Sequence, residues 1–355
     1  MKNLIYLKNY YKAYLLSHLR LIKDKKEKGK YLDLGILNSS IASTNLGDII
    51  IYESVYNQLR EVFSDDFFTD YPTQIHIATD AKYLMSQKNL LFISGTNLLS
   101  SNLESRYQWK IDNSHRKFLF NKVVLVGVGW WQYQGDINNY TSKIYKSVLN
   151  RDVYHSVRDH YSVDKLNSIG IKNVLNTSCP TLWNITPAKC DSIPKTKAEN
   201  VVTTLTCYKK NIALDAKMLS ILSKNFNKVY LWIQSYLDFE YLNEIGLQLP
   251  NLELIPPTVE AYDKILLKGG VDYIGTRLHA GIRAIQKDIR TLILAVDNRA
   301  IEISKDVNLN VIKRENVEDV QTFIDNSYET KIMLPYENIE LFKKTLVDFR
   351  RENTI

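Results

Sequence analysis

The stretch VDYIGTRLHAGIRAI (271–285) passes from an apolar strand pattern directly into a helical one. VDYIG (271–275) is apolar enough for a buried strand, and the apolar residues after it recur at helical spacing. Arg277 and His279 therefore stand at a strand-to-helix junction, next to the first free backbone N–H groups of a helix. Such a junction favours an anion, because the unpaired donors and the helix dipole both point outward.

The same alternation of short strands and amphipathic helices runs outward from this stretch. The strand patterns are LDLGIL (32–37), QIHIA (74–78), NLLFIS (89–94), KVVLVGVG (122–129), VYHSV (153–157), NVLNT (173–177), VVTTLT (201–206), KVYLWI (228–233), LELIP (252–256) and TLILAV (291–296). Alternation of this kind predicts parallel sheets covered by helices on both faces. We therefore expect an α/β protein with two Rossmann-like domains that face a cleft.

The expected boundaries follow from the breaks in this alternation. A polar, lysine- and proline-containing stretch at 184–199 serves as a linker between a domain at 31–183 and a domain at 200–330. Residues 331–355 contain a final helix (336–351) that we expect to cross back to the first domain.

Composition limits the class of protein. The 355 residues suffice for two domains, and no stretch approaches the roughly 20 apolar residues of a membrane span. The basic N-terminus lacks the apolar core of a secretory signal. Cys179, Cys190 and Cys207 are odd in number and lack C-x-x-C spacing, which indicates a reducing cytoplasm without disulfides or zinc. We expect Cys207 to be a core residue.

The positive charge is confined to one segment. Residues 1–30 contain nine basic residues against Asp24 and Glu27, a net +7 that equals the formal charge of the whole chain. A general nucleic-acid-binding surface is therefore not expected. The apolar face of the predicted helix in this segment consists of Leu4, Leu7, Tyr11, Tyr14, Leu15, Leu19 and Ile22. This basic amphipathic extension either rests on an anionic membrane or packs on protein, its own or a second subunit.

Ligands of open α/β sheets bind beyond the carboxyl ends of the strands, so the loops there supply candidate residues. In NLGD (45–48), Gly47 permits close backbone approach, and Asp48 either caps the helix or acts as a base. Arg158 either reaches the cleft or pairs with Asp159. The aromatic loop WWQYQG (130–135) either binds a sugar face or packs internally.

The missing motifs exclude several chemistries. The chain has no G-x-G-x-x-G dinucleotide fingerprint, no G-x-x-x-x-G-K-[ST] phosphate loop, no G-x-S-x-G elbow and no H-E-x-x-H. It also has no D-x-D of the kind that holds a metal on a nucleotide-sugar. We expect a site without metal or cofactor that binds an anion through arginine, histidine and helix N-termini.

Four segments carry a family resemblance: NLGD (45–48), the loop at 95–99, VRD with the helix and strand after it (157–175), and IGTRLHAGIRA (274–284). In these segments, and in their order, the chain resembles the polysaccharide pyruvyl transferase family. The match covers most of residues 40–300. SGTN (94–97) departs from a common run of glycines, and TSCPTLW (177–183) replaces a commoner D-P element.

The resemblance implies a GT-B-like fold and phosphoenolpyruvate as donor, whose pyruvyl group becomes a ketal on two sugar hydroxyls. His279 would be the general acid and Asp48 the base. The donor side would use Arg277, Arg158, Thr276 and Gly275; the acceptor side would use Asn45, Gly47, Thr96, Asn97, Trp130 and Trp131. The acceptor would be a capsule, O-antigen or other cell-surface repeat, carried on a polyprenyl diphosphate at the inner membrane face.

Two other functions stay open at this point. A GT-B glycosyltransferase with a nucleotide-sugar donor would need a base-binding pocket near 252–260, with a carboxylate such as Glu260. A non-catalytic glycan-binding scaffold would have Arg277 and His279 blocked or turned inward. The sequence does not identify the acceptor sugar or the oligomeric state.

Overall fold

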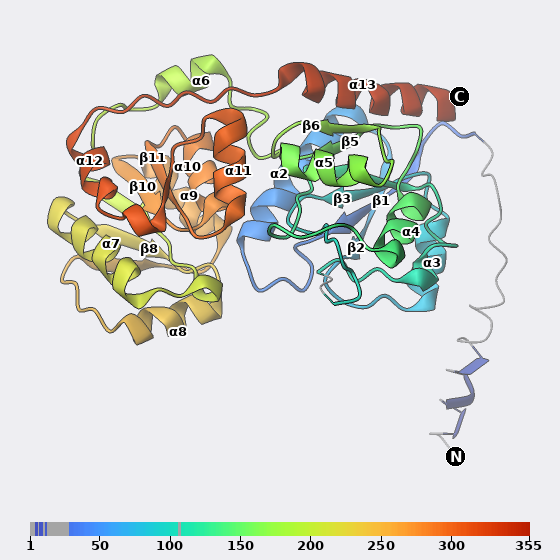
Figure 1. Ribbon diagram of the computed structural model, residues 1–355, viewed down its shortest axis with the longest axis horizontal. Coiled ribbons are helices and arrows are strands. Elements are labelled where there is room, and N and C mark those ends of the chain that lie inside the picture. Colours follow the sequence, from blue (N-terminus) through green and yellow to red (C-terminus); the bar gives the residue numbers. More distant parts are fainter. Residues whose placement is uncertain (1–3, 6, 10, 13–27, 106–107) are drawn as a thin grey trace.

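The computed structural model describes residues 4, 5, 7–9, 11, 12, 28–105 and 108–355. From residue 28 on, the chain forms two α/β halves, each built on a parallel sheet (Figure 1). The strands are β1 (Asp33–Asn38), β2 (Phe67–Pro72), β3 (Leu91–Ser94), β4 (Val123–Val126), β5 (His155–Val157), β6 (Val174–Asn176), β7 (Asn200–Thr203), β8 (Val229–Trp232), β9 (Leu252–Ile255), β10 (Val271–Gly275), β11 (Thr291–Ala295) and β12 (Val311–Lys313). This confirms the predicted α/β fold class.

The order of the strands explains where the loops meet. The first sheet has the order β2-β1-β3-β4, and the parallel pair β5-β6 continues it through a bridge between Val128 and Val157. The second sheet has the order β12-β11-β10-β7-β8-β9. Strands β3, β4, β10 and β11 are buried along their whole length, which is why they read as continuous apolar runs.

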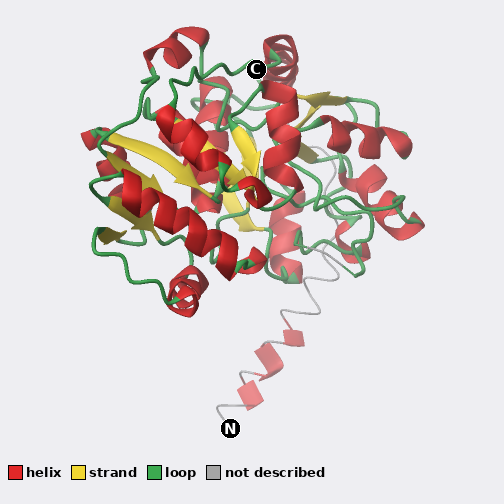
Figure 2. Ribbon diagram, turned by 60° about the vertical axis from the view of Figure 1, so that its left-hand side comes forward, coloured by secondary structure: helices red, strands yellow, loops and turns green. Residues whose placement is uncertain are grey.

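Helices lie on both sides of the larger sheet (Figure 2). Their bounds are α2 (Gly47–Val62), α3 (Thr79–Ser86), α4 (Asn139–Val148), α5 (His160–Ser168), α6 (Pro187–Ser192), α7 (Ile212–Asn225), α8 (Tyr236–Ile245), α9 (Val259–Lys268), α10 (Leu278–Gln286), α11 (Asn298–Val307), α12 (Asp319–Asp325) and α13 (Tyr336–Asn353). Each of the two crossovers β10-α10-β11 and β11-α11-β12 returns the chain to a neighbouring parallel strand.

One strand prediction is wrong. QIHIA (74–78) is a loop that leads into α3, and the strand beside β1 is β2. Strand β2 is an edge strand whose residues are mostly exposed or half-buried, so FFTDYP has neither the apolar run nor the alternation that marks a strand.

The stretch at 184–199 contains the short helix α6, and the last helix returns to the first half (Figure 1). Helix α13 packs on α2, β5 and β6. Phe342 of α13 is buried, with its ring centroid 6.0 Å from that of Trp183. Arg350 Nε lies 2.7 Å from a carboxylate oxygen of Asp66. The first half of the molecule is therefore completed by residues from the C-terminal end of the chain.

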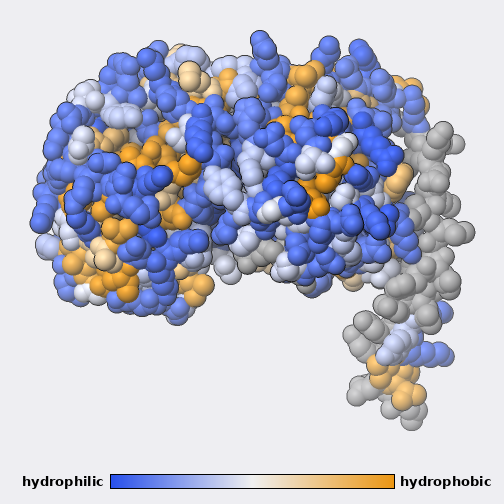
Figure 3. Space-filling view, viewed as in Figure 1, coloured by the Kyte–Doolittle hydropathy of each residue, from blue (hydrophilic) through white to orange (hydrophobic). Residues whose placement is uncertain are grey.

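Residues 4, 5, 7–9, 11 and 12 of the N-terminal segment are helical and stand away from the body (Figure 1). Leu4, Leu7 and Tyr11 are exposed, and apolar side chains are visible there in Figure 3. The other four residues of the predicted apolar face, Tyr14, Leu15, Leu19 and Ile22, lie outside the described residues. No helix in the described part of the chain is long and apolar enough to cross a membrane.

Candidate active site

A cleft of about 420 Å³ lies between the two halves, at the carboxyl ends of their strands. The first half lines it with loops after β1, β3 and β4, and the second half with the segments that begin at residues 207, 235, 277 and 297. A smaller hollow adjoins the cleft and is lined by the N-terminal residues of α10 and α11 and by Gly47. The lining residues that both hollows share are Asn45, Tyr208, Arg277, Asp297 and Arg299.

Three helices begin at this place. Helix α2 starts in the first half, and α10 and α11 start in the second, where they follow the central strands β10 and β11. The N-caps of α2 and α10 are Leu46 and Arg277, neither of which makes a side-chain cap. In α2 these positions are occupied, since Gly47 N–H donates to Asn45 Oδ1 at 3.1 Å and Asp48 N–H donates to Asn45 O at 3.0 Å. The first N–H groups of α10 have no acceptor among the described residues, and the dipole of this helix favours negative charge there. This end of the cleft therefore favours an anion.

Arg277 lies in the cleft as predicted from its place at the junction, but most of its guanidinium is already engaged. Nη2 lies 2.6 Å from both carboxylate oxygens of the buried Asp238, and Nε donates to Leu205 O at 2.9 Å. The remaining Nη1 is left for a ligand. The partner, 39 residues away in the sequence, was not predicted.

His279 also lines the smaller hollow and is 7% exposed. Its Nε2 lies 3.7 Å from the sulfur of Cys179, a buried residue of the TSCPTLW segment that the sequence did not single out. Burial, followed by the charges of Arg158 and Arg299, holds the pKa of His279 well below its ordinary value. The imidazole is therefore neutral near neutral pH when no anion is present.

Arg158 is not among the lining residues of either hollow, but it is the least compensated cation around them. It is 1% exposed, its Nε has no hydrogen-bond partner among the described residues, and the carboxylate of Asp159 lies 3.6 Å away. Asp159 also accepts a bond from Ser162 N–H as the N-cap of α5. A Cβ at Gly129 would lie 2.2 Å from Arg158 Nε, so glycine is needed there for the guanidinium to fit. Burial lowers the pKa of Arg158, and Asp159 only partly offsets this.

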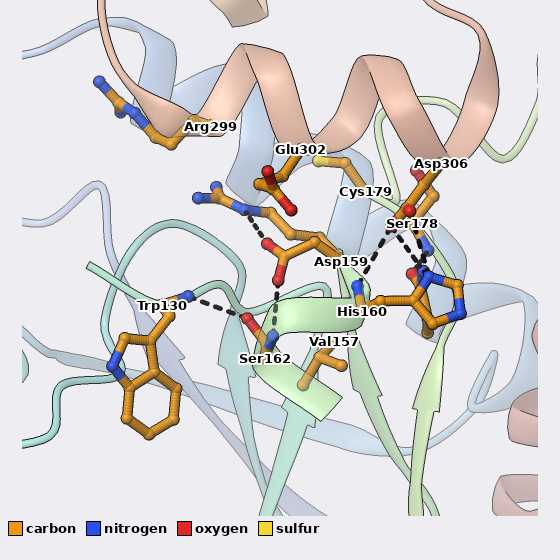
Figure 4. A network of polar contacts seen from close by, with 12 residues as sticks. Trp130, Val157, Asp159, His160, Ser162, Ser178, Cys179, Arg299, Glu302 and Asp306 are labelled. Carbon is orange, nitrogen blue, oxygen red and sulfur yellow. Dashed lines mark hydrogen bonds and ion pairs between the residues drawn. The ribbon is translucent and has the colours of Figure 1, made fainter. Parts of the chain in front are cut away.

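Arg299, which was not among the predicted site residues, faces this arginine from the second half. It lies in the first turn of α11, donates to Asp297 and Tyr208, and also lines both hollows. Figure 4 shows the side chains that face one another across the two halves: Arg299, Glu302 and Asp306 on α11, and Asp159, His160 and Cys179 opposite. The sequence signal was DNR (297–299), directly after the carboxyl end of β11.

Asp48 faces the cleft and does not cap its helix, so the capping interpretation is wrong. Its carboxylate accepts from Ser43 Oγ at 2.6 Å and, more weakly, from Gln74 and Thr96 at 3.4 Å. Burial raises the pKa of Asp48, although the bond from Ser43 and the charge of Arg299 act in the opposite direction. A buried carboxyl of this kind suits proton transfer.

The loop after β3 is held in an unusual conformation beside Asp48. Gly95 and Thr96 both have positive φ, +60° and +57°, which a β-branched residue rarely adopts. The Asn97 side-chain oxygen is buried without a partner among the described residues. Thr96 and Asn97 both line the cleft. Strain and an unpaired polar group together indicate a functional loop.

The other predicted site residues divide into two groups. Asn45, Gly47 and Trp131 line the hollows, as does Thr276, whose hydroxyl bonds Thr206. Trp130 does not face the cleft: it is 1% exposed and its ring packs edge-on against Tyr145.

Two other expectations need revision. Gly275 serves packing, because a Cβ there would lie 2.6 Å from Thr204 Oγ1. Cys207, expected in the core, lines the cleft. No group of three or more histidine, cysteine, aspartate or glutamate side chains in the described part of the chain is arranged to hold a metal.

Fold and site together define a two-domain, GT-B-like α/β protein with a cleft lined by arginines at its domain interface. The family model "Polysaccharide pyruvyl transferase" matches residues 45–298, and the chain belongs to this family of transferases. Among curated protein sequences, none matches the chain significantly.

Solved structures resemble the chain in fold. UDP-GlcNAc 2-epimerase of Methanocaldococcus jannaschii, in complex with UDP-GlcNAc and UDP, is 11% identical with a TM-score of 0.53 over 90% of this chain and 99% of that one. The Neisseria meningitidis UDP-GlcNAc 2-epimerase, bound to UDP-GlcNAc, is also 11% identical, with a TM-score of 0.48 over the same shares. Heptosyltransferase WaaC of E. coli is 10% identical, with a TM-score of 0.38 over 74% of this chain and 88% of that one.

Proposed function

We propose that the protein transfers the pyruvyl group of phosphoenolpyruvate to two hydroxyls of a sugar in a cell-surface polysaccharide repeat. The products are a pyruvate ketal and inorganic phosphate. The observation that carries this proposal is Arg158, a buried arginine with one carboxylate at 3.6 Å, whose charge acts on His279 in the first turn of α10. A buried, incompletely paired cation is costly unless a ligand supplies the anion.

Phosphoenolpyruvate fits the charges around the cleft. It carries a phosphate and a carboxylate, and arginine is the side chain that binds both groups in a planar, bidentate manner. Arg158 and the free Nη1 of Arg277 would hold one group each, with backbone N–H groups of α10 as further donors. Arg299 would neutralise the developing charge of the departing phosphate.

His279 is the proposed general acid. It would deliver a proton to the methylene carbon of the enol, which makes the adjacent carbon electrophilic. One sugar hydroxyl bonds to this carbon and loses its proton, the bond to the phosphate oxygen breaks, and a second hydroxyl closes the ketal ring. The two hydroxyl protons balance the one gained by the methyl group and the one that leaves with phosphate. The phosphate charge would raise the low pKa of His279 and so supply the protonated imidazole.

Asp48 is the proposed base for the attacking hydroxyl. It lines the cleft from the first half, where the charge of Arg299 from the second half acts on it, and His279 lines the adjoining smaller hollow. The acceptor sugar would lie against Asn45, Thr96, Asn97 and Trp131, which share this side of the cleft. A polyprenyl-diphosphate carrier and the inner membrane face are proposed for the acceptor, because residues 1–30 carry a net +7.

Neither alternative function gains support from the cleft. Within the described residues, the lining of both hollows includes none from 252–260, and Glu260 is exposed. The base-binding pocket expected of a nucleotide-sugar transferase is thus not formed there. Arg277 and His279 both line the smaller hollow, so neither is shut away as in a scaffold.

Thermal shift with a ligand panel tests the donor. The panel contains phosphoenolpyruvate, UDP-sugars, GDP-sugars and CMP-linked acids, with wild-type protein and Arg158→Gln. A ligand at about 100 times its dissociation constant stabilises the fold by roughly 2.7 kcal/mol, which is easily measured. We expect phosphoenolpyruvate to stabilise the wild-type protein and not the Arg158→Gln variant. Stabilisation by a nucleotide-sugar, and not by phosphoenolpyruvate, would replace the proposal with a glycosyltransferase.

A further inference from the structure

A hollow larger than the cleft lies on the outer side of the first half. It has a volume of about 780 Å³ and is formed by α3, the segment at 113–120 and the end of α4. We call it the basic groove, defined by its lining residues Thr79, Lys82, Asn113, Ser114, Arg116, Lys117, Phe118, Phe120 and Ser147. Three of these residues are cationic and none is acidic.

The three cations of the basic groove have only neutral partners among the described residues. Lys82 Nζ donates to Ser114 Oγ at 2.6 Å, and Arg116 Nη1 donates to Asn113 Oδ1 at 3.0 Å. Lys117 lies over the Phe118 ring, 4.8 Å from its centroid. The Nε of Arg116 is buried without a hydrogen-bond partner in this part of the chain. The groove thus presents three positive charges that no carboxylate of the described protein neutralises.

Asp112, a carboxylate just before the residues that line the groove, is occupied elsewhere. It accepts from Ser114 N–H and Oγ and pairs with His115 Nδ1 at 3.0 Å. Although burial acts to raise it, the bonds from Ser114 and His115 lower the pKa of Asp112 to about 2. Asp112 therefore fixes the segment that carries Arg116 and Lys117 and leaves their charges free.

An apolar surface accompanies these charges. The Phe120 ring is 55% exposed, and the guanidinium of Arg151 lies over it, 5.4 Å from the centroid. Aromatic rings next to cations suit a ligand that combines apolar C–H faces with anionic groups, as an acidic sugar does.

Two paired segments connect the basic groove to the cleft. Gln74 and Gln108 line the cleft, and Thr79 and Asn113, each five residues further on, line the groove. Lys110 N–H donates to Thr73 O at 2.7 Å, so the two segments run together. Five residues span at most about 18 Å. A short oligosaccharide can therefore occupy both places at once.

We propose that the basic groove is a second binding site, which holds carboxylate or phosphate groups of the acceptor while the reacting sugar lies in the cleft. This inference rests on the proposed function, because it takes the cleft ligand to be part of a longer glycan. Charge complementarity at the groove would select acceptors that carry anionic groups several units from the sugar that is modified.

Calorimetric titration of the full chain tests the basic groove with defined probes. The probes are tetragalacturonate, the neutral galactose tetrasaccharide of the same linkage, and inorganic pyrophosphate. The groove variant carries Lys82→Gln, Arg116→Gln and Lys117→Gln; the control carries Lys224→Gln, Lys264→Gln and Lys268→Gln, three exposed lysines of the second half. Both lose three positive charges, and both keep the basic N-terminal segment. Each is first checked by thermal melting, and the single variant Lys117→Gln serves if the triple one melts early.

We expect an anionic probe to bind the wild type and the control variant with equal affinity, and the groove variant at least tenfold more weakly. Added salt should reduce this difference in affinity, because it screens the charges of the groove. If tetragalacturonate is the probe that binds, the acceptor is a carboxylated glycan. If pyrophosphate is the probe that binds, the acceptor or its carrier bears phosphate. The proposal would be overturned if the groove variant bound both anionic probes as tightly as the wild type does. It would also be overturned if a single-stranded oligonucleotide of the same charge bound the groove more tightly than these probes. Phosphoenolpyruvate binding, measured separately in the groove variant, should be unchanged. If the wild type does not bind phosphoenolpyruvate, the proposed function is contradicted, but the result for the groove is not affected.

Discussion

Arg158 and Arg277 are both buried arginines beside the cleft, but their surroundings differ. Arg277 donates to both carboxylate oxygens of Asp238, whereas Arg158 has a carboxylate only at 3.6 Å. Arg277→Gln should lower the free energy of unfolding by about 3–5 kcal/mol, because Asp238 is left buried without its cation. Arg158→Gln should change it by less than about 1 kcal/mol, since Asp159 keeps its bond to Ser162 N–H. Urea denaturation of the two variants checks this.

The same pair of variants separates structure from ligand binding. Arg158→Gln should fold as well as wild type and yet lose the stabilisation by phosphoenolpyruvate, as expected of a residue kept for function at some cost to stability. If it unfolds as readily as Arg277→Gln, then Arg158 is a structural residue and the donor site must be sought elsewhere.

We expect His279 to make binding of the proposed donor depend on pH. Burial, Arg158 and Arg299 lower its pKa in the ligand-free protein, and a bound phosphate raises it. Binding therefore takes up a proton, and affinity should increase as pH falls through the pKa of the bound state. Below the pKa of the free protein this gain levels off. Calorimetry between about pH 5 and pH 9 measures the effect.

The control for this experiment is His279→Asn, which keeps polarity and removes the titrating group. The phosphate of the donor itself titrates near pH ~6, so the pH dependence that remains in the variant is the one due to the ligand. The difference between the pH profiles of wild type and variant is therefore due to His279. Identical pH profiles would mean that His279 stays neutral in the complex and is not the acid.

Sequence patterns located these residues but not their charge states. The junction at Arg277 and His279 and the loop at Asp48 were predicted from strand ends, because that rule depends on local order along the chain. The Arg277–Asp238 pair and the contact of His279 with Cys179 join positions 39 and 100 residues apart. Long-range contacts of this kind decide whether an arginine is free for a ligand, and no local pattern contains them.

At the scale of elements, the site depends on how closely two loops approach. Gly129 follows β4, and a Cβ there would lie 2.2 Å from Arg158 Nε. Gly129→Ala should displace the guanidinium, weaken phosphoenolpyruvate binding at least tenfold, and cost about 1–3 kcal/mol of stability through overpacking. Gly135→Ala, where an added Cβ meets nothing within 4 Å, is the matched control and should leave both unchanged. Unaltered binding in Gly129→Ala would show that the position of Arg158 does not matter.

Most elements were predictable because apolar periodicity and burial agree. β10 and β11 are buried along their whole length, so their apolar runs identified them. β2 was missed because an edge strand with exposed residues needs no apolar pattern. Trp130 and Trp131 are adjacent, yet one packs on Tyr145 and the other lines the cleft. Adjacent side chains in an extended segment point to opposite sides, and the sequence does not say which side is the cleft.

At the scale of the whole molecule, the two halves are joined around the cleft by bonds that flank it. Tyr133 donates to Glu302 at 2.5 Å, and Asp306 contacts both His160 and Asn176. These contacts bring α11, with Arg299 in its first turn, against the first half near Arg158. The proposed donor site therefore needs residues from both halves.

The N-terminal segment contributes charge, and the apolar residues described in it are exposed. Leu4, Leu7 and Tyr11 are exposed, whereas Gly29 is bridged to Thr354. Deletion of residues 2–27 should therefore leave the melting temperature unchanged. It should also abolish binding to vesicles that contain anionic lipid, because each basic residue near such a surface contributes roughly 1 kcal/mol. Vesicle sedimentation at low and high salt measures this, with vesicles of neutral lipid as control. A deleted protein that melts early would place the segment in the fold, and one that still binds anionic vesicles would move the membrane contact to the body of the protein.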